Sequence, residues 1–415
     1  MGEKQIFVVG AGIVGLACAI DAQNRGHHVT LIDPADPGTG CSFGNAGIIA
    51  ASEIFPLITP ARLVSLPQML MARDAPAVIG LRGLPRLMPW MLRAATTLSA
   101  ARQRTIVDGL VALNGAAVGA WRDLLALCGA PGRLREKGMI RLIREKRDLD
   151  GLIETGERLG RHGLPSRLLD KRELKMLEPA LGDAVIGGLL HESDADIGEP
   201  FGVSQILLRR FRGAGGTVIG QRAMAIRPLE RGAELQIESD KRVADQIIVA
   251  AGLASGDLLR PFGVSVPLQA ERGYHLGLHG MGGRLGRPVT FQRESCVATP
   301  MGSTLRLAGT VEFADADAPA DWRRAHRLAI AAQRYFAEPL QQSSPALWMG
   351  SRPSLPDSLP AIGKLKNAPA IGYAFGHQHL GITQAAVTSK LVGNLMAGED
   401  MPFDAAPYSL SRFWG

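Results

Sequence analysis

Cysteine is scarce in this chain: its 415 residues include four, at positions 18, 41, 128 and 296. They lie far apart and show no metal-ligand spacing, so we expect no metal centre. Reduced thiols in a cytoplasmic protein are the simplest interpretation of such a pattern.

Long hydrophobic runs are missing as well. No uninterrupted stretch of about 18 apolar residues occurs, which argues against a segment that spans a bilayer. Blocks of Lys and Arg, and basic residues interleaved with aromatic ones, are also absent, so we expect no nucleic-acid partner. The net charge of +7 still permits an anionic partner, such as a membrane surface or an acidic substrate.

What remains is the composition of a globular protein. Hydrophobic residues make up 46% and charged residues 20%, values typical of a soluble chain. A length of 415 residues is large for a single core and predicts two or three domains.

The opening residues carry the strongest pattern. An apolar run over residues 5–9 leads into Gly10-Ala11-Gly12-Ile13-Val14-Gly15, then a small-residue helix pattern and a second apolar run over 29–32. Gly10 permits a tight turn, Gly12 lets the backbone approach a pyrophosphate, and Gly15 lets the helix pack closely on the sheet. The helix N-terminus would offer N–H groups to the phosphates. We therefore predict a dinucleotide site here.

Two features extend this site. Asp33 ends the second run, where it is placed to accept hydrogen bonds from ribose hydroxyls, and an acid there favours FAD or NAD over NADP. A second small-residue turn, Ala250-Ala251-Gly252, follows an apolar run far along the chain. That separation predicts one nucleotide domain built from distant segments.

Residues 61–130 differ from the rest of the chain. Prolines punctuate short apolar pieces, and a stripe at helical spacing predicts a longer helix through Leu110, Asn114, Val118, Trp121 and Leu125. Seven arginines lie in the first part of the segment, at positions 62, 73, 82, 86, 93, 102 and 104. A basic, apolar segment of this kind can lie on an anionic membrane, but a helical cap that buries its apolar face within the protein is the alternative.

Taken in order, these pieces resemble the D-amino-acid oxidase/dehydrogenase family of FAD-dependent amine oxidoreductases. The resemblance rests on residues 10–15 with Asp33, Ser42-Phe43-Gly44-Asn45-Ala46-Gly47, Ala250-Ala251-Gly252, Arg306-Leu307-Ala308-Gly309-Thr310-Val311-Glu312, Gly350-Ser351-Arg352-Pro353-Ser354-Leu355-Pro356-Asp357, and the glycine-flanked loop before the last helix. The set is similar to the bacterial D-amino-acid dehydrogenase branch. The loop Gly376-His377-Gln378-His379-Leu380-Gly381 is closer to enzymes acting on D-hydroxyproline or related secondary amines.

The resemblance implies an α/β fold with two main parts. One is a Rossmann-like FAD-binding domain built from the discontinuous segments 1–60, 198–260 and 350–415. The other is an α+β substrate domain with a mixed or antiparallel sheet, covering 131–197 and 261–349. Residues 61–130 would form a helical insertion.

It also implies an activity. We expect FAD-dependent oxidative deamination or dehydrogenation of a D-amino acid or a cyclic secondary amine, by hydride transfer from Cα to flavin N5, with electrons passed to a quinone or another acceptor. A glycine- or sarcosine-type oxidase using O2, an electron-relay flavoprotein subunit of a larger complex and an NAD-dependent dehydrogenase are the alternatives. We expect a cytoplasmic protein, with peripheral contact to the inner membrane as an option.

Three residues are the candidates for contact with the substrate. Arg352 is the first choice to bind the substrate carboxylate bidentately, with Arg272 and Arg306 as rivals and structural pairing as the alternative. Tyr274 could close the pocket and hydrogen-bond the carboxylate. His379, like His377, would touch flavin or substrate unless it is a satisfied structural residue.

The resemblance also implies a cofactor-binding set. Backbone N–H groups at the start of the last helix would face the flavin N1–O2 edge, which becomes negative on reduction; a plain C-terminal helix is the alternative. The set comprises Gly10, Gly12, Ile13, Val14, Gly15, Asp33, Ser42, Asn45, Ala46, Gly47, Ala251, Gly252, Arg352, Gly376, His379, Leu380, Gly381, Ile382 and Thr383.

Overall fold

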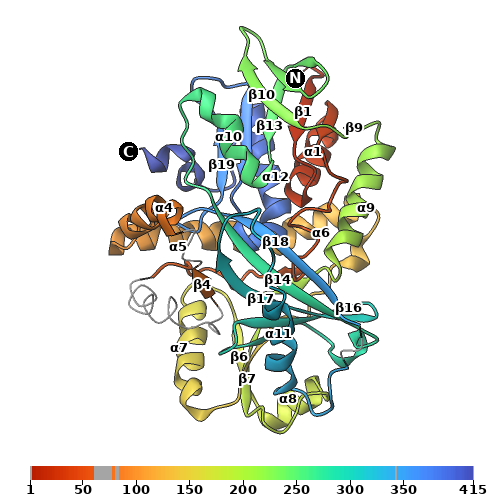
Figure 1. Cartoon of the computed structure of the whole chain (residues 1–415), viewed down its shortest axis with the longest axis vertical. Coiled ribbons are helices and arrows are strands. Elements are labelled where there is room, and N and C mark those ends of the chain that lie inside the picture. The colour runs from red at the N-terminus through yellow and green to blue at the C-terminus, as the bar shows by residue number, and fades with distance from the viewer. Residues whose placement is uncertain (1, 60–76, 80–83, 342–343, 415) are drawn as a thin grey trace.

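Two sheets, one above the other in Figure 1, organise the molecule. The computed structural model describes residues 2–59, 77–79, 84–341 and 344–414. The upper sheet has the strand order β19-β20-β13-β1-β2-β9, and the lower sheet has the order β18-β14-β17-β16-β15-β5-β7-β6, with β4 paired to β17. The α/β fold class is therefore confirmed.

The upper sheet is parallel except for its edge strand β19. Its strands are β1 (Gln5–Val9), β2 (His28–Ile32), β9 (Thr217–Ile219), β13 (Gln246–Val249), β19 (Ala361–Lys364) and β20 (Ile371–Phe375). The central strands are apolar along their length because helices and loops cover both faces. As expected, distant parts of the chain supply these strands.

Three helices pack around this sheet: α1 (Ile13–Asn24), α9 (Pro200–Gly213) and α12 (Gly381–Ala397). Glu199 caps α9, since its carboxylate accepts from the N–H groups of Phe201 at 3.2 Å and Gly202 at 2.7 Å. Pro200 occupies the first helical position, where no N–H is needed.

The lower sheet is mixed. Its strands are β4 (Ala77–Ile79), β5 (Met139–Ile143), β6 (Ser166–Asp170), β7 (Gly187–His191), β14 (Gln269–His279), β15 (Val289–Phe291), β16 (Cys296–Met301), β17 (Thr304–Phe313) and β18 (Ala346–Ser354). Helices α7 (Leu149–Gly160), α8 (Lys171–Leu177) and α11 (Arg323–Gln333) lie around it (Figure 1).

Smaller elements join these layers. A three-stranded antiparallel sheet consists of β10 (Ala223–Pro228), β11 (Ala233–Ile237) and β12 (Lys241–Ala244). Strands β3 (Ile48–Ile49) and β8 (Ala195–Asp196) pair, and α10 (Ser255–Leu259) follows β13.

Strand β18 crosses the boundary that we predicted at residue 350. It pairs with β14 along its whole length, from Ala346 opposite Gly277 to Ser354 opposite Gln269. Residues 350–354 therefore belong to the lower sheet. The proline at 353 hid this strand in the sequence, but β18 is an edge strand, where proline is tolerated.

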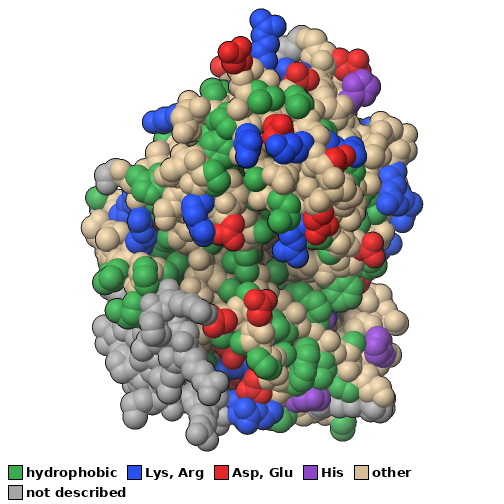
Figure 2. Space-filling view, turned by 45° about the horizontal axis from the view of Figure 1, so that its top comes forward, with side chains coloured by type: hydrophobic (Ala, Val, Ile, Leu, Met, Phe, Trp, Pro, Cys, Tyr) green, Lys and Arg blue, Asp and Glu red, His purple; other side chains and the backbone are tan. Residues whose placement is uncertain are grey.

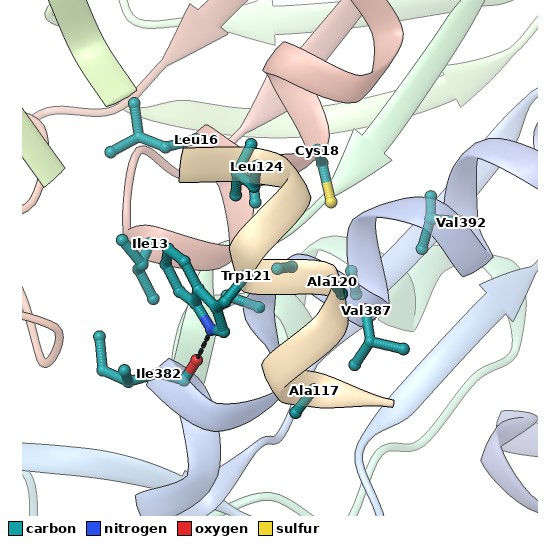
Figure 3. Packing of buried hydrophobic residues seen from close by; sticks show 14 of the residues in the cluster. Ile13, Leu16, Cys18, Ala117, Ala120, Trp121, Leu124, Ile382, Val387 and Val392 are labelled. Carbon is teal, nitrogen blue, oxygen red and sulfur yellow. Dashed lines mark hydrogen bonds between the residues drawn. The ribbon is translucent and has the colours of Figure 1, made fainter. Parts of the chain in front are cut away.

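The segment 61–130 is helical where the structure describes it, with α4 (Leu84–Thr96), α5 (Ala100–Gly115) and α6 (Ala117–Leu127). The predicted single helix is two helices, because the chain turns at Ala116. Leu110, Trp121 and Leu125 are nonetheless buried together, as the stripe predicts. Figure 3 shows α6 packed against α1 and α12.

One stretch of the described residues, Ala100–Leu127, is long and apolar enough to cross a membrane by length and composition. Charged residues such as Asp108 and Arg122 interrupt this stretch, so it is not a continuous apolar run. Core helices of soluble proteins pass the same test, and here Leu113 and Trp121 are fully buried within the fold.

Two described arginines of this segment contact the end of the chain. Arg93 donates to the carbonyl of Phe413 at 2.7 Å, and Arg102 donates to the carbonyl of Arg412 at 3.0 Å, so both hold the last residues of the chain. Arg62, Arg73 and Arg82 lie outside the described residues, as does the side chain of Arg86. On the face in Figure 2, Lys and Arg are scattered among Asp and Glu.

Candidate active site

A cavity of about 1190 Å³ is lined by residues of both sheets. The cavity wall includes every residue predicted to bind cofactor except Gly15 and Gly47. Segments that are far apart in the sequence, including the first glycine turn, the Ala250–Gly252 turn and the loop before α12, therefore meet at one place.

The first glycine turn has the geometry that its sequence predicts. Gly10 has φ +107°, a conformation that side chains rarely adopt, and a Cβ there would run into the carbonyl of Ala250. A Cβ at Gly15 would overlap the carbonyl oxygen of Gly10, which explains why Gly15 serves packing without lining the cavity. Gly12 begins α1 and gives it no side-chain cap.

Asp33 lies at the end of β2, against this turn. Its Oδ2 accepts from the Ala11 N–H at 2.8 Å, and its Oδ1 accepts from the Ala35 N–H at 2.9 Å. A carboxylate has about four acceptor positions, so each oxygen retains capacity for a ribose hydroxyl. The acid thus holds the turn and faces the cavity at the same time.

The loop 42–47 ties the turn to the end of the chain. Ser42 Oγ accepts from the Ile13 N–H at 3.0 Å, at the start of α1. Asn45 Nδ2 donates to the carbonyl of His379 at 3.1 Å, and Asn45 Oδ1 accepts from the Gly47 N–H at 2.9 Å. These two side chains therefore fix neighbouring backbone at the cavity.

Arg306 supports the same loop from below. Its guanidinium donates to the carbonyls of Phe43 at 3.0 Å and Asn45 at 2.8 Å, and burial lowers its pKa to about 10. Arg306 is not part of the cavity wall. Arg306, predicted as a rival to Arg352 for the substrate carboxylate, therefore has a structural role.

The loop before α12 is tightly constrained. Gly376 has φ +80° and Gln378 has φ 52°, and the Gln378 amide donates to the carbonyl of Leu355 at 2.8 Å. His377 is buried, its Nε2 lies 3.0 Å from Thr388 Oγ1, and burial lowers its pKa to about 3. His379 lines the cavity beside it.

The first turn of α12 is held from two sides. Thr383 Oγ1 accepts from the Ala50 N–H at 3.1 Å and donates to the carbonyl of Ile48 at 3.2 Å. The indole of Trp121 donates to the carbonyl of Ile382 at 2.7 Å (Figure 3). The helix start therefore presents its N–H groups and positive dipole end to the cavity from a fixed position.

Arg352 forms a pair with a buried carboxylate. Its Nη1 donates to Glu271 Oε1 at 2.9 Å, and Ser354 Oγ donates to Glu271 Oε2 at 2.7 Å. Burial raises the pKa of Glu271, but the charges of Arg352 and His379 and the hydrogen bonds lower it, and the net shift is downward. The guanidinium covers Gly273, where a Cβ would collide with it. No described residue accepts from its other N–H groups, which can donate to a carboxylate.

Tyr274 of β14 lines the cavity, whereas its neighbour Arg272 does not. Tyr274 is fully buried; its hydroxyl donates to Glu312 at 2.7 Å and accepts from the Asp321 N–H at 3.1 Å. Burial and then Glu312 raise its pKa to about 12. Arg272 donates to the carbonyl of Pro319 at 2.9 Å. The role predicted for Tyr274 would require its hydroxyl to leave Glu312.

Glu53, Arg141, Glu271 and Thr310 are among the cavity residues that were not predicted as site residues from the sequence. Arg141 on β5 pairs with Glu53 at 3.2 Å. Two of them have a recognisable pattern in the sequence. Arg141 is a charged residue within the apolar run Met139–Ile143, and Thr310 directly follows Gly309. Such a pattern becomes specific only when the strands are assembled.

The residues present fit FAD. Gly10 and Gly12 bring backbone without side chains to the cavity wall, α1 begins at Gly12 with no cap from that residue's side chain, and Asp33 offers acceptors. The start of α12 offers donors at the other side of the same cavity.

The comparisons with known proteins agree with this fit. The family model for FAD-dependent oxidoreductases, DAO, matches residues 5–395. The chain belongs to this family. It is an FAD-dependent oxidoreductase, and the expected family and cofactor are confirmed.

Curated relatives match over nearly the full length. The chain is 30% identical to a D-amino-acid oxidase of Bradyrhizobium diazoefficiens, over 99% of each chain. It is 29% identical to a D-amino acid dehydrogenase of Methylobacterium radiotolerans, over 98% of this chain and 99% of the relative. Among solved structures, glycine oxidase from Geobacillus kaustophilus superimposes with a TM-score of 0.75 at 21% identity, over 99% of each chain.

Proposed function

We propose that this protein oxidises the C–N bond of an amino acid, with a D-amino acid or a cyclic secondary amino acid such as D-proline or D-hydroxyproline as substrate. The observation that supports this most is one cavity that joins the glycine turn, the start of α12 and the guanidinium of Arg352. The names of the curated relatives favour the same substrate class.

In this proposal the chain's own residues orient the substrate. Arg352 binds the substrate carboxylate through the N–H groups not used by Glu271, and Glu271 holds the guanidinium in place. FAD, when bound, takes up the hydride from Cα together with its two electrons. The substrate amine must be neutral, so that its lone pair assists the loss of hydride.

The start of α12 contributes an electrostatic term. Gly381, Ile382 and Thr383 aim the positive end of the helix at the cavity, where negative charge is then stabilised. Water opens the imine product to a 2-oxo acid and ammonia, whereas a cyclic amine yields a cyclic imine.

The decisive experiment is anaerobic mixing of the purified, yellow protein with D-alanine, D-proline and D-hydroxyproline, with the L-enantiomers as controls. We expect bleaching of the flavin absorption by at least one D-compound. No bleaching with any amine of the panel supports an electron-relay subunit instead. A colourless protein that responds only to a nicotinamide cofactor would overturn the proposal.

A second measurement identifies the electron acceptor. We propose a quinone or another carrier rather than O2. After reduction by substrate, reoxidation by a soluble quinone should be much faster than by air. Rapid formation of peroxide in air would instead indicate an oxidase, as the name of the Bradyrhizobium relative suggests for that protein.

We also propose a cytoplasmic protein that makes peripheral membrane contact. Two side chains of α4 support contact, since Met88 is 43% and Leu92 is 64% exposed. Cosedimentation with anionic vesicles at low salt tests it, with zwitterionic vesicles as the control. Recovery of all protein in the supernatant in both cases would remove the membrane part of the proposal.

A further inference from the structure

Thr310, in the middle of β17, has a backbone conformation that its side chain disfavours. Its φ is 58°, in the left-handed region. A β-branched residue is an outlier there, because the side chain crowds the backbone. Such strain persists only when the surrounding structure enforces it, and it gathers at functional sites.

The cause of the strain is a bulge in the pairing of β17 with β14. Arg272 lies opposite Glu312 and Tyr274 lies opposite Gly309, so Thr310 and Val311 together face the single residue Gly273. A bulge of this kind re-aims a side chain, and glycine is the usual residue at its left-handed position. This chain keeps a threonine there instead.

The Thr310 hydroxyl is buried at the cavity wall. Among the described residues, none supplies a hydrogen-bond partner to Thr310 Oγ1. Both Thr310 and Val311 line the cavity. A buried hydroxyl without a partner costs free energy, so a ligand that supplies one would recover it.

Gly273 is the neighbour that Thr310 and Arg352 share. The bulge faces Gly273 from β17, and the Arg352 guanidinium covers the same residue from β18. A guanidinium and a hydroxyl that line one cavity beside a shared neighbour are donors suited to the two oxygens of a carboxylate.

We propose that Thr310 is a substrate-binding residue, whose hydroxyl donates to the substrate carboxylate beside Arg352. This rests on the proposed function. The bulge then has a purpose: it turns the hydroxyl toward the substrate, and the strain is the cost of that orientation.

The test compares Thr310→Val, which removes the hydroxyl and keeps the shape, with Thr310→Ser, which keeps the hydroxyl. Anaerobic reduction of the bound flavin by D-alanine and D-proline gives the substrate Kd. We expect about a tenfold weaker Kd for T310V and a value near wild type for T310S. An unchanged Kd in T310V would overturn the proposal.

Thr299→Val is the matched control. Thr299 is also fully buried with a hydroxyl that has no partner among the described residues, but it lies on β16, outside the cavity wall. We expect no change in its substrate Kd. Thr310→Gly should raise the melting temperature by relieving strain and still weaken substrate binding as T310V does.

A ligand without nitrogen separates carboxylate binding from amine binding. Cyclopentanecarboxylate has the ring and carboxylate of proline but no amine. We expect T310V to weaken its inhibition constant by the same factor as the Kd of D-proline. If T310V weakens binding of D-proline but not of cyclopentanecarboxylate, the assignment is overturned. Loss of bound FAD with an unchanged substrate Kd would also overturn it. Failure of wild-type protein to react with the panel would instead refute the proposed function.

Discussion

At the scale of single residues, Arg352 and Glu271 form an ion pair at the cavity wall. The carboxylate is 2% exposed and the guanidinium 22%, so the pair is largely withdrawn from water. Removing one member of such a pair leaves an uncompensated buried charge, whereas replacing both costs much less.

We therefore predict different outcomes for Arg352→Met and for R352M combined with Glu271→Gln. The single variant should lose about 3 kcal/mol of unfolding free energy because Glu271 is left without its cation. The double variant should recover most of it. Urea unfolding measures both.

Substrate affinity then separates the two interpretations of Arg352. If it binds the carboxylate, both variants should show a Kd weaker by about a hundredfold. A double variant with wild-type affinity for the substrate would mean that Arg352 only neutralises Glu271.

Asp194 provides a second prediction at this scale. It is 1% exposed and accepts from the N–H and Oγ of Ser52, both at 2.8 Å. Desolvation raises its pKa from 3.8 to about 7, with Glu53 adding to the rise, while Ser52 and Arg141 oppose it. The folded state thus binds a proton that the unfolded state releases between about pH 4 and pH 7.

Stability contributed by this group therefore falls as pH rises through that window and is level above it. The total is on the order of 4 kcal/mol. Asp194→Asn should remove this pH dependence, so that the unfolding free energy of the variant relative to that of the wild type rises between pH 4 and pH 7. Parallel pH dependences of unfolding free energy for the two proteins would contradict the assignment.

At the scale of elements, one indole helps to hold the start of α12. Trp121 is fully buried and donates to the carbonyl of Ile382, in the first turn of the helix. Trp121→Phe leaves that carbonyl without its partner, at a cost of about 1–3 kcal/mol. We expect a lower melting temperature and a faster loss of FAD on dilution.

Tyr408→Phe is the control for this variant. Tyr408 is buried and donates to the carbonyl of Gly109 at 2.7 Å, away from the cavity wall. It should lose similar stability and retain FAD. Equal retention of FAD in both variants would show that the Trp121 contact serves packing alone.

The sequence predicts elements well where local chemistry determines them. Residues 10–15 require glycine at two close approaches, and Glu199-Pro200 starts α9 through a cap. Prediction from the sequence fails where strand pairing determines the structure. Pro353 made the edge strand β18 hard to recognise, and the bulge at Thr310 follows only from the register of β17 with β14. For the same reason, Glu271 could not be assigned to Arg352 from the sequence.

Charged residues show the same limit in the site. Arg272, Arg306 and Arg352 look alike in the sequence, since each has a glycine within three positions. In the structure they face different partners, namely the carbonyl of Pro319, the carbonyls of loop 42–47, and Glu271 at the cavity. Which partner each arginine meets depends on the face of the sheet on which its side chain lies, and that face follows only from the register of the paired strands.

At the scale of the whole molecule, one cavity of about 1190 Å³ is lined by both sheets. FAD bound there contacts both halves, so it should stabilise the entire chain rather than one domain. We predict that removal of FAD lowers the melting temperature, and that FAD added at a hundred times its Kd raises the unfolding free energy by about 2.7 kcal/mol. Differential scanning calorimetry of both forms measures this, and a melting temperature independent of FAD would contradict it.

The strand order of the upper sheet also bears on biosynthesis. β13 and β1 are neighbours, but β20 and the helix that follows it come from the last part of the described chain. A ribosome releases β1 early and α12 late, so a nascent polypeptide has only half of the flavin cradle for most of its synthesis. Cofactor loading is therefore a late event, and cells short of riboflavin should accumulate chains that are fully translated but immature.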